Sequence, residues 1–179
     1  MLKKIFVFLA VIVVVFVIVA ALQPAEYRVA RSTSISAPPA VVFAHVNDLH
    51  KFQRWSPFAK IDPAAKNVFE GPASGTGAVL VWSGNAEVGE GRMTIIESHP
   101  DDLIRFQLDF VKPFTSTATA EFTFKPENNQ TVVTWTVAGR KNFVSKAISL
   151  FMSMDKMIGS QFEKGLADLK SLSESAPKP

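Results

Sequence analysis

Cysteine is absent from this 179-residue chain, and tyrosine occurs only once. Without cysteine the protein has no disulfide, no thiolate nucleophile and no cysteine-ligated metal. The three histidines do not replace it, because His45 and His50 lie five residues apart and His99 stands alone beside Pro100. Five residues correspond to a rotation of about 140° around a helix, so His45 and His50 share no face. The sequence therefore predicts no metal site, and these histidines are expected at the surface or in caps.

The chain also lacks any run of lysine or arginine. Of its 19 basic residues, Lys3 and Lys4 precede a long apolar segment, and the 17 that remain nearly balance the 16 acidic residues. A nucleic-acid-binding domain gathers its positive charge into a patch or stripe. Nucleic acid is therefore excluded as the expected partner.

No glycine-rich stretch has the pattern of a nucleotide site. Neither 71–77 nor 84–91 is followed by the Lys-Ser/Thr pair of a phosphate loop, and neither opens a predicted helix. Both stretches are interpreted as turns and points of sheet curvature, with Gly89 and Gly91 at a bend or bulge in a strand. No cofactor is predicted.

What the sequence does have is an uninterrupted apolar segment, Ile5–Leu22, which contains only Ile, Phe, Val, Leu and Ala. These eighteen residues would form a helix about 27 Å long, close to the roughly 30 Å hydrocarbon core of a bilayer. In lipid the lack of backbone partners requires a helix despite the many valines. Residues 1–24 are therefore predicted to be a membrane anchor. The alternative is a signal peptide cleaved after Val19-Ala20-Ala21, a small-residue pattern typical of cleavage sites.

The charges that flank this segment predict its orientation. Lys3 and Lys4 precede it, so the positive-inside rule places the N-terminus in the cytoplasm. Arg28 and Arg31, shortly after the segment, weaken this asymmetry. We expect a single-pass membrane protein whose domain lies on the periplasmic or extracellular side, with the membrane as a partner through residues 5–22.

Beyond the anchor, the sequence predicts one domain over residues 25–172. Residues 27–36 alternate as a strand, Pro39 begins a short helix, and a loop-rich stretch follows to Pro63. Six further strands are predicted near 67–70, 78–82, 88–98, 103–111, 115–125 and 131–138, with a hairpin turn at Asn128-Asn129.

From Phe143 to about Leu172 the apolar period becomes helical, which predicts one long amphipathic helix with Gly159 and Gly165 at a close approach or bend. Residues 173–179 have nothing to bury and are expected to form a disordered tail. Strands that run together with helices set apart indicate an α+β domain with an antiparallel sheet.

Several stretches resemble the START-like (SRPBCC, helix-grip) superfamily, in its polyketide cyclase/dehydrase-type branch. The resemblance covers roughly Glu26 to Leu172 and is carried by Ser34-Ile35-Ser36-Ala37-Pro38, Val42-Phe43, Val46-Asn47-Asp48-Leu49, Trp55-Ser56-Pro57, Val88 to Ile95, Val133-Thr134-Trp135-Thr136, Met154 to Gly159 and Phe162 to Leu166. It implies a helix-grip fold, in which a curved antiparallel sheet wraps around the long C-terminal helix and leaves an apolar cavity between them. The superfamily has no universal catalytic motif, so the resemblance transfers no activity.

The residues that would line such a cavity are mainly aromatic, and fifteen phenylalanines make this reading attractive. Met152 would adapt to an irregular ligand, while Arg92 and Asp155 would be polar handles. The alternative is a packed core without a cavity. The predicted lining residues are Trp55, Phe58, Trp82, Arg92, Phe106, Phe110, Phe122, Met152 and Asp155.

No pair of carboxylates is placed for acid–base chemistry. Glu87 and Glu90 are three residues apart on a predicted strand, which points them to opposite faces. The leading hypothesis is therefore a membrane-tethered binding protein for an apolar small molecule or lipid. The alternatives are a cyclase/dehydrase-like enzyme that uses Asp155, Arg92 or Glu90, and an envelope protein interaction module with a filled core.

Overall fold

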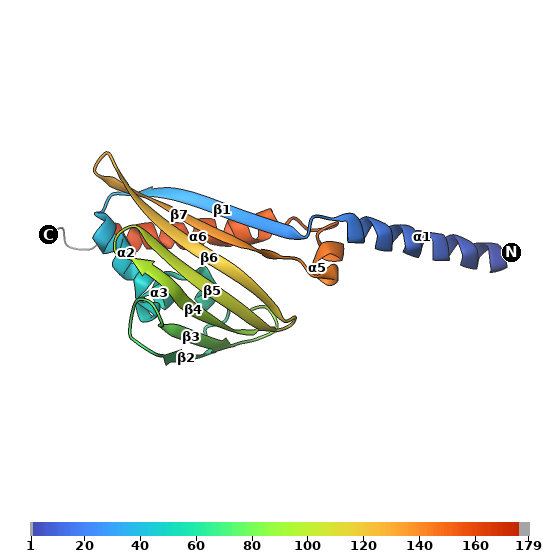
Figure 1. Cartoon of the computed structure of the whole chain (residues 1–179), viewed down its shortest axis with the longest axis horizontal. Coiled ribbons are helices and arrows are strands. Elements are labelled where there is room, and N and C mark those ends of the chain that lie inside the picture. Colours follow the sequence, from blue (N-terminus) through green and yellow to red (C-terminus); the bar gives the residue numbers. More distant parts are fainter. Residues whose placement is uncertain (1, 176–179) are drawn as a thin grey trace.

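The computed structural model describes residues 2–175 and has two visibly different parts. The apolar N-terminal segment is a straight helix, α1 (Leu2–Leu22), which extends away from a domain built of a sheet and several helices (Figure 1). Helix α1 is exposed along almost its whole length, and within it only Ala20 is buried. It is long and apolar enough to cross a membrane.

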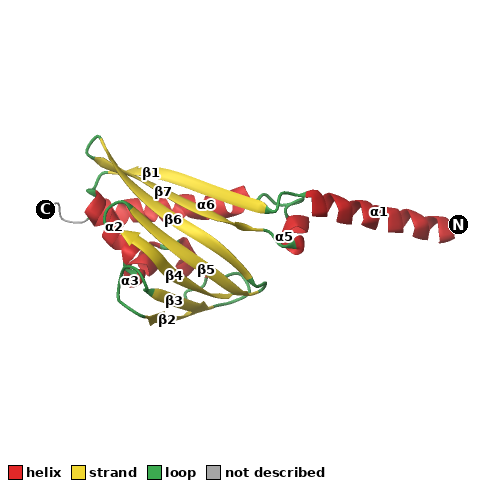
Figure 2. Ribbon diagram, viewed as in Figure 1, coloured by secondary structure: helices red, strands yellow, loops and turns green. Residues whose placement is uncertain are grey.

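The domain is built on one antiparallel sheet of seven strands in the order β1-β7-β6-β5-β4-β3-β2. Strands β2 and β3 are short, whereas the other five have ten to twelve residues and make a long, twisted surface (Figure 2). The strands are β1 (Glu26–Ile35), β2 (Lys66–Glu70), β3 (Val79–Ser83), β4 (Glu90–His99), β5 (Leu103–Lys112), β6 (Ser116–Glu127) and β7 (Gln130–Arg140). Asn128 and Asn129, both with positive φ, form the predicted hairpin turn between β6 and β7.

Three short helices connect β1 to β2: α2 (Pro39–Asn47), α3 (Leu49–Trp55) and α4 (Pro57–Ile61). Asp48 separates the first two, because its side chain accepts hydrogen bonds from the backbone N–H groups of His50 (2.9 Å) and Lys51 (3.2 Å) and so caps α3. The stretch predicted to be loop-rich after the first helix is therefore mostly helical.

The predicted single helix from Phe143 to Leu172 is wrong. The chain forms a short helix, α5 (Phe143–Ile148), and then a long one, α6 (Met154–Glu174). Asn142 caps the first and Ser153 the second, each by accepting a backbone N–H of the following turn. Helix α6 continues to Glu174 and buries Ser173, so residues 173 and 174 do not belong to the predicted tail. Residues 176–179 of that tail lie outside the described range.

Helix α6 lies across the inner face of the sheet and packs most extensively on β1 (Figure 2). Alternate residues of the strands face it: Ile104 and Phe106 on β5, and Phe122 and Phe124 on β6, are all buried as their alternation predicts. With the helices on one face of an antiparallel sheet, the predicted α+β helix-grip architecture is confirmed.

One end of the sheet adjoins α1, and we call it the anchor end. Because β1 begins there and every neighbouring pair of strands is antiparallel, β1, β2, β4 and β6 begin at this end, whereas β3, β5 and β7 finish at it. Backbone pairings that mark the anchor end are Glu26 with Arg140, Phe110 with Ser116, Glu90 with Lys112, Ser83 with Glu90 and Lys66 with Ser83.

Candidate functional site

A cavity of about 330 Å³ lies between the inner face of the sheet, α6 and the short helices α3 and α4. Pockets that take small organic ligands begin at roughly this size, about 300 Å³. The cavity wall combines nine aromatic side chains with aliphatic ones: Tyr27, Phe52, Phe58, Trp82, Phe106, Phe110, Phe122, Trp135 and Phe162, together with Ala59, Ala65, Leu80, Val88, Met93, Leu108, Ala120, Val137 and Ile158. The space therefore suits the apolar body of a ligand.

Five of the nine predicted lining residues do lie on this wall. They are Phe58, Trp82, Phe106, Phe110 and Phe122. The strand residues among them come from inward-facing positions of β3, β5 and β6, and alternation predicted this for Phe106, Phe110 and Phe122. That these side chains contact a ligand remains a prediction.

Trp82 reaches the cavity because of a glycine opposite it. Trp82 pairs with Gly91 across β3 and β4, and a Cβ at position 91 would overlap the Trp82 ring. The strand pairing shifts register between Glu90 and Gly91, as expected for the predicted bulge. The glycine thus lets the indole lie over the backbone of β4, with its Nε1 donating to the carbonyl of Val88 at 3.3 Å.

Four predicted lining residues lie elsewhere. Trp55 is 1% exposed but belongs to the layer behind the wall, where its ring stands 5.9 Å from Phe122 and its Nε1 donates to the carbonyl of His45. Arg92 follows the inward-facing Gly91 and so points to the outer face, where it forms an ion pair with Glu70. Met152 is half exposed in the segment between α5 and α6, because the helix breaks there.

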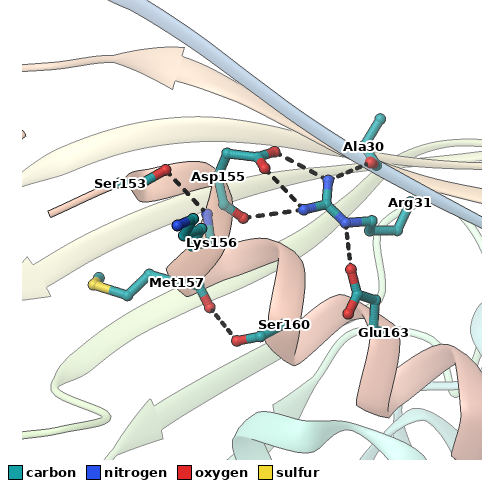
Figure 3. Close-up of polar contacts among 8 residues, drawn as sticks. All are labelled: Ala30, Arg31, Ser153, Asp155, Lys156, Met157, Ser160 and Glu163. Atoms are coloured by element: carbon teal, nitrogen blue, oxygen red, sulfur yellow. Dashed lines mark hydrogen bonds and ion pairs between the residues drawn. The ribbon is translucent and has the colours of Figure 1, made fainter.

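Asp155, the fourth, lies outside the cavity in an ion-pair cluster between α6 and β1 (Figure 3). Its carboxylate accepts hydrogen bonds from Nη1 (3.0 Å) and Nη2 (2.9 Å) of Arg31, whose Nε donates to Oε1 of Glu163 at 2.7 Å. The Arg31 guanidinium holds the pKa of Asp155 below its ordinary value, and the two carboxylates raise the pKa of Arg31. The cluster therefore fixes the first turns of α6 on the sheet rather than serving a ligand.

Polar side chains on the cavity wall are few, and none of them is among the nine predicted lining residues. They are Tyr27, Gln53, Ser56, Asn67 and Glu87. Tyr27 and Asn67 come from the anchor ends of β1 and β2, and Glu87 from the turn that precedes β4 at the same end. Three of the five polar residues on the wall therefore lie toward the anchor end, whereas Gln53 and Ser56 come from α3 and the residue after it.

Tyr27 is the most informative of these residues. Its ring packs against Gly139, where a Cβ would come within 2.9 Å of the phenol oxygen. Burial raises the pKa of Tyr27, so the phenol stays protonated and can donate a hydrogen bond. Within residues 2–175 its hydroxyl has no hydrogen-bond partner. The sequence could have predicted Tyr27 as a lining residue, because this single tyrosine stands at an inward-facing position of its strand.

Glu87 was expected on a strand and lies instead in the turn between β3 and β4. The Asn85 side chain holds this turn by accepting the backbone N–H groups of Glu87 (2.9 Å) and Val88 (3.2 Å). Glu90, by contrast, forms an ion pair with Lys112 that lowers the pKa of its carboxyl, and it does not line the cavity. In the part of the chain that the structure describes, no three metal-ligating side chains come together. The arrangement can desolvate an apolar molecule and offer it hydrogen bonds at one end.

Comparison with known proteins gives a family and a fold. The model of the family described as "Polyketide cyclase / dehydrase and lipid transport" matches residues 26–174. A search of curated proteins gives no match.

Solved structures share the fold at low sequence identity. A protein of Chromobacterium violaceum is 16% identical with a TM-score of 0.60, over 86% of this chain and 100% of its own. The Aha1 protein of Colwellia psychrerythraea, solved as a dimer, is 15% identical with a TM-score of 0.59, over 83% and 97% of the two chains. The di-domain ARO/CYC StfQ of the steffimycin biosynthetic pathway is 12% identical with a TM-score of 0.61, over 84% of this chain and 51% of its own.

Proposed function

We propose that this chain, which belongs to the polyketide cyclase/dehydrase and lipid transport family, binds an apolar small molecule or lipid in its cavity while tethered to a membrane. The observation that carries the proposal is the cavity of about 330 Å³ with an aromatic and aliphatic wall and polar groups toward one end. Family and fold together indicate a domain that binds hydrophobic ligands. Membrane tethering, the nature of the ligand and its contacts are the parts of the proposal that experiment must test.

The wall favours an elongated or ring-containing ligand with one polar end. Its apolar body would lie against Phe106, Phe122 and Leu108, and each 100 Å² of ligand surface removed from water contributes about 2.5 kcal/mol. The phenol of Tyr27 would donate a hydrogen bond to a carbonyl, hydroxyl or ether oxygen at the anchor end. A carrier or sequestering role needs no more chemistry than this.

Helix α1 is the proposed tether, with the N-terminus in the cytoplasm and the domain on the other side of the membrane. Three contacts support retention of α1 over its removal as a signal peptide. Ala20 is buried, the ring of Phe16 stacks on Phe151 with centroids 6.2 Å apart, and the Lys146 ammonium donates to the carbonyl of Ala21 at 3.1 Å. Cleavage after Ala21 would remove all three.

An enzyme of the cyclase/dehydrase kind is the alternative that the family description favours. Its earlier candidates Asp155, Arg92 and Glu90 all form ion pairs away from the cavity. Such an enzyme would have to use Tyr27 and Glu87, which are the ionisable side chains on the wall. An interaction module with a filled core is disfavoured, because the core contains a cavity.

The proposal is tested by native mass spectrometry of the full chain extracted from membranes in detergent. We expect an apolar molecule bound in a one-to-one complex, identified after organic extraction, and an intact mass that includes residues 1–24. Ala120→Leu, which adds bulk to the cavity wall, should abolish that complex. It should also abolish binding of the apolar dye N-phenylnaphthylamine. Ala30→Leu is the matched control, because Ala30 is exposed on the outer side of β1.

Two results would contradict the proposal. The first is the same bound molecule, at the same occupancy, in Ala120→Leu. The second is a chain that carries no apolar molecule and binds no dye. Tyr27→Phe and Glu87→Gln separate carriage from catalysis, because loss of turnover with retained binding would favour the enzyme.

A further inference from the structure

Large apolar side chains are exposed at the anchor end in unusual number. Outside α1, eleven such residues are exposed, and eight of them lie in β5, the β5–β6 turn, α5, the α5–α6 connection or the first turn of α6. The eight are Val111, Phe114, Phe143, Val144, Ile148, Phe151, Met152 and Met157. Scattered exposed apolar residues are ordinary, but a concentration in one region marks an interaction surface.

Five of these side chains belong to one stretch, Phe143–Met152, which we call the juxtamembrane segment. It comprises α5 and the connection to α6, and Phe151 is 78% exposed while Phe143 is 50% exposed. The segment packs beside α1 (Figure 1), through the stack of Phe16 on Phe151 and the bond from Lys146 to the carbonyl of Ala21. A segment that contacts the last two turns of a membrane-spanning helix lies at the level of the bilayer surface.

The charges around the segment fit the same surface. Within residues 2–175, Arg28, Arg140, Lys141, Lys146 and Lys156 form no ion pair with an acidic side chain. All five belong to the start of β1, the end of β7, the β7–α5 connection, α5 or the first turn of α6, which are the parts of the domain next to α1. Exposed apolar side chains bordered by lysine and arginine are the composition of elements that lie in the interface of an anionic bilayer.

The segment also leads directly to the cavity. It runs into α6, whose second turn places Ile158 on the cavity wall, and the polar wall residues Tyr27, Asn67 and Glu87 lie at the anchor end as well. A bilayer that contacts the segment would therefore lie next to the end of the cavity where the polar groups of a bound molecule are expected.

We infer that the juxtamembrane segment, Phe143–Met152, inserts its apolar side chains into the bilayer interface on the domain's side of the membrane, so that ligands exchange between the bilayer and the cavity without crossing bulk water. The inference rests on the proposed function, because it takes α1 as the tether and the cavity as the binding site. It adds the partner of this surface, a lipid bilayer with anionic headgroups, and the source of the ligand.

The absence of cysteine makes the first test clean, because each single-cysteine variant carries one label. Val13→Cys reports on α1, Met152→Cys on the segment, and Glu127→Cys on the opposite end of the sheet. Each full-length variant is labelled with nitrobenzoxadiazole and reconstituted into phosphatidylcholine vesicles with a minority of phosphatidylglycerol. Quenching is compared between spin-labelled lipids and aqueous iodide.

We expect lipid-borne quenching at positions 13 and 152, and iodide quenching at position 127. Lipid quenching at position 13 alone would overturn the docking of the segment while leaving the tether intact. No lipid quenching at either position would overturn the tether and, with it, the inference.

The second test separates docking from ligand binding. Phe143→Glu combined with Ile148→Glu should slow the exchange of N-phenylnaphthylamine from vesicles by roughly tenfold or more, because burial of two apolar side chains is lost. Equilibrium binding of the dye in detergent should stay unchanged. Val68→Glu combined with Ile96→Glu is the matched control, since both residues are comparably exposed away from the segment. Equal exchange rates in the two double variants would overturn the inference. Failure of the wild-type chain to bind the dye in detergent would instead overturn the proposed function.

Discussion

At the scale of single residues, His45 is the most unusual titratable group of the domain. It lies in α2, its Nδ1 is buried, and among residues 2–175 that nitrogen has no hydrogen-bond partner. Burial lowers the pKa of His45, and the positive charges of Lys51 and Arg54 lower it further. The folded protein therefore favours the neutral imidazole.

The sign of the resulting pH dependence follows directly. Below the ordinary histidine pKa of about 6.5, the unfolded chain binds a proton at this position more readily than the folded chain does, so stability falls as the pH falls. The fall ends once the pH is below the lowered pKa of the folded state. We expect the free energy of unfolding to decrease between about pH 7 and pH 5 by more in the wild type than in His45→Gln.

Urea denaturation at the two pH values measures this difference. Because carboxylates titrate in both proteins, only the difference between wild type and variant reports on His45. Equal pH dependence in the two proteins would show that burial does not disfavour the charged ring.

The positions of some lining residues could be predicted from the sequence, and those of others could not. The inward positions of β5 and β6 were predictable, because a strand alternates and three lining aromatics, Phe106, Phe110 and Phe122, follow from that rule. Arg92 and Asp155 were misplaced for opposite reasons. Arg92 obeys the same alternation but was assigned to the inner face, and the position of Asp155 depends on Arg31, 124 residues away in the sequence. Such a long-range ion pair has no local signature.

At the scale of elements, two glycines determine how closely α6 approaches its neighbours. At Gly165 a Cβ would stand 2.8 Å from Cδ of Pro57 and 2.9 Å from the Trp135 ring. At Gly159 a Cβ would overlap the Arg31 guanidinium instead. Pro57 and Trp135 are rigid and buried, whereas the Arg31 side chain is long and partly exposed. The two positions therefore respond differently to the same added methyl group.

We predict that Gly165→Ala lowers the free energy of unfolding by about 1–3 kcal/mol, the usual cost of overpacking a core. Gly159→Ala should cost clearly less. The arginine can swing aside, and alanine is favoured over glycine in a helix interior by about 0.5–1 kcal/mol. Guanidinium denaturation of both variants measures the contrast. A larger loss in Gly159→Ala would mean that the ion-pair cluster of Arg31 matters more than the contact with Pro57 and Trp135.

The break between α5 and α6 is a helix boundary that the apolar periodicity of the sequence could not predict. The apolar period continues across residues 149–153 and so predicts a single helix. The helix is interrupted because the Ser153 side chain accepts the backbone N–H of Lys156 and so begins a new helix, while α5 packs against α1. Serine occurs within helices as well as at caps, so the sequence alone does not distinguish the two outcomes. The strands, by contrast, were predicted to within a few residues, because turns with glycine, proline and asparagine separate them.

At the scale of the whole molecule, helix α1 and the domain share little surface. Within residues 2–175, α1 packs mainly against α5, and the core of the domain contains none of its side chains. We predict that a chain lacking residues 2–22 unfolds cooperatively, with a Tm within about 4 °C of the full chain in the same detergent, equivalent to about 1 kcal/mol. Circular dichroism melting of both proteins tests this. Loss of a cooperative transition on truncation would show that α1 contributes to folding.

Only Gln23, Pro24 and Ala25 connect α1 to β1. Four steps between Cα atoms span at most about 14 Å, and the contacts of α1 with α5 shorten even that distance. If α1 is the tether proposed above, a domain on so short a connection cannot carry a ligand across an aqueous compartment tens of ångströms wide. Such a domain would release its ligand close to the membrane that holds it, either into the bilayer or to a second protein bound there. Under the proposed function, the three-residue connection therefore favours exchange of ligand at one place on the membrane over transport between membranes.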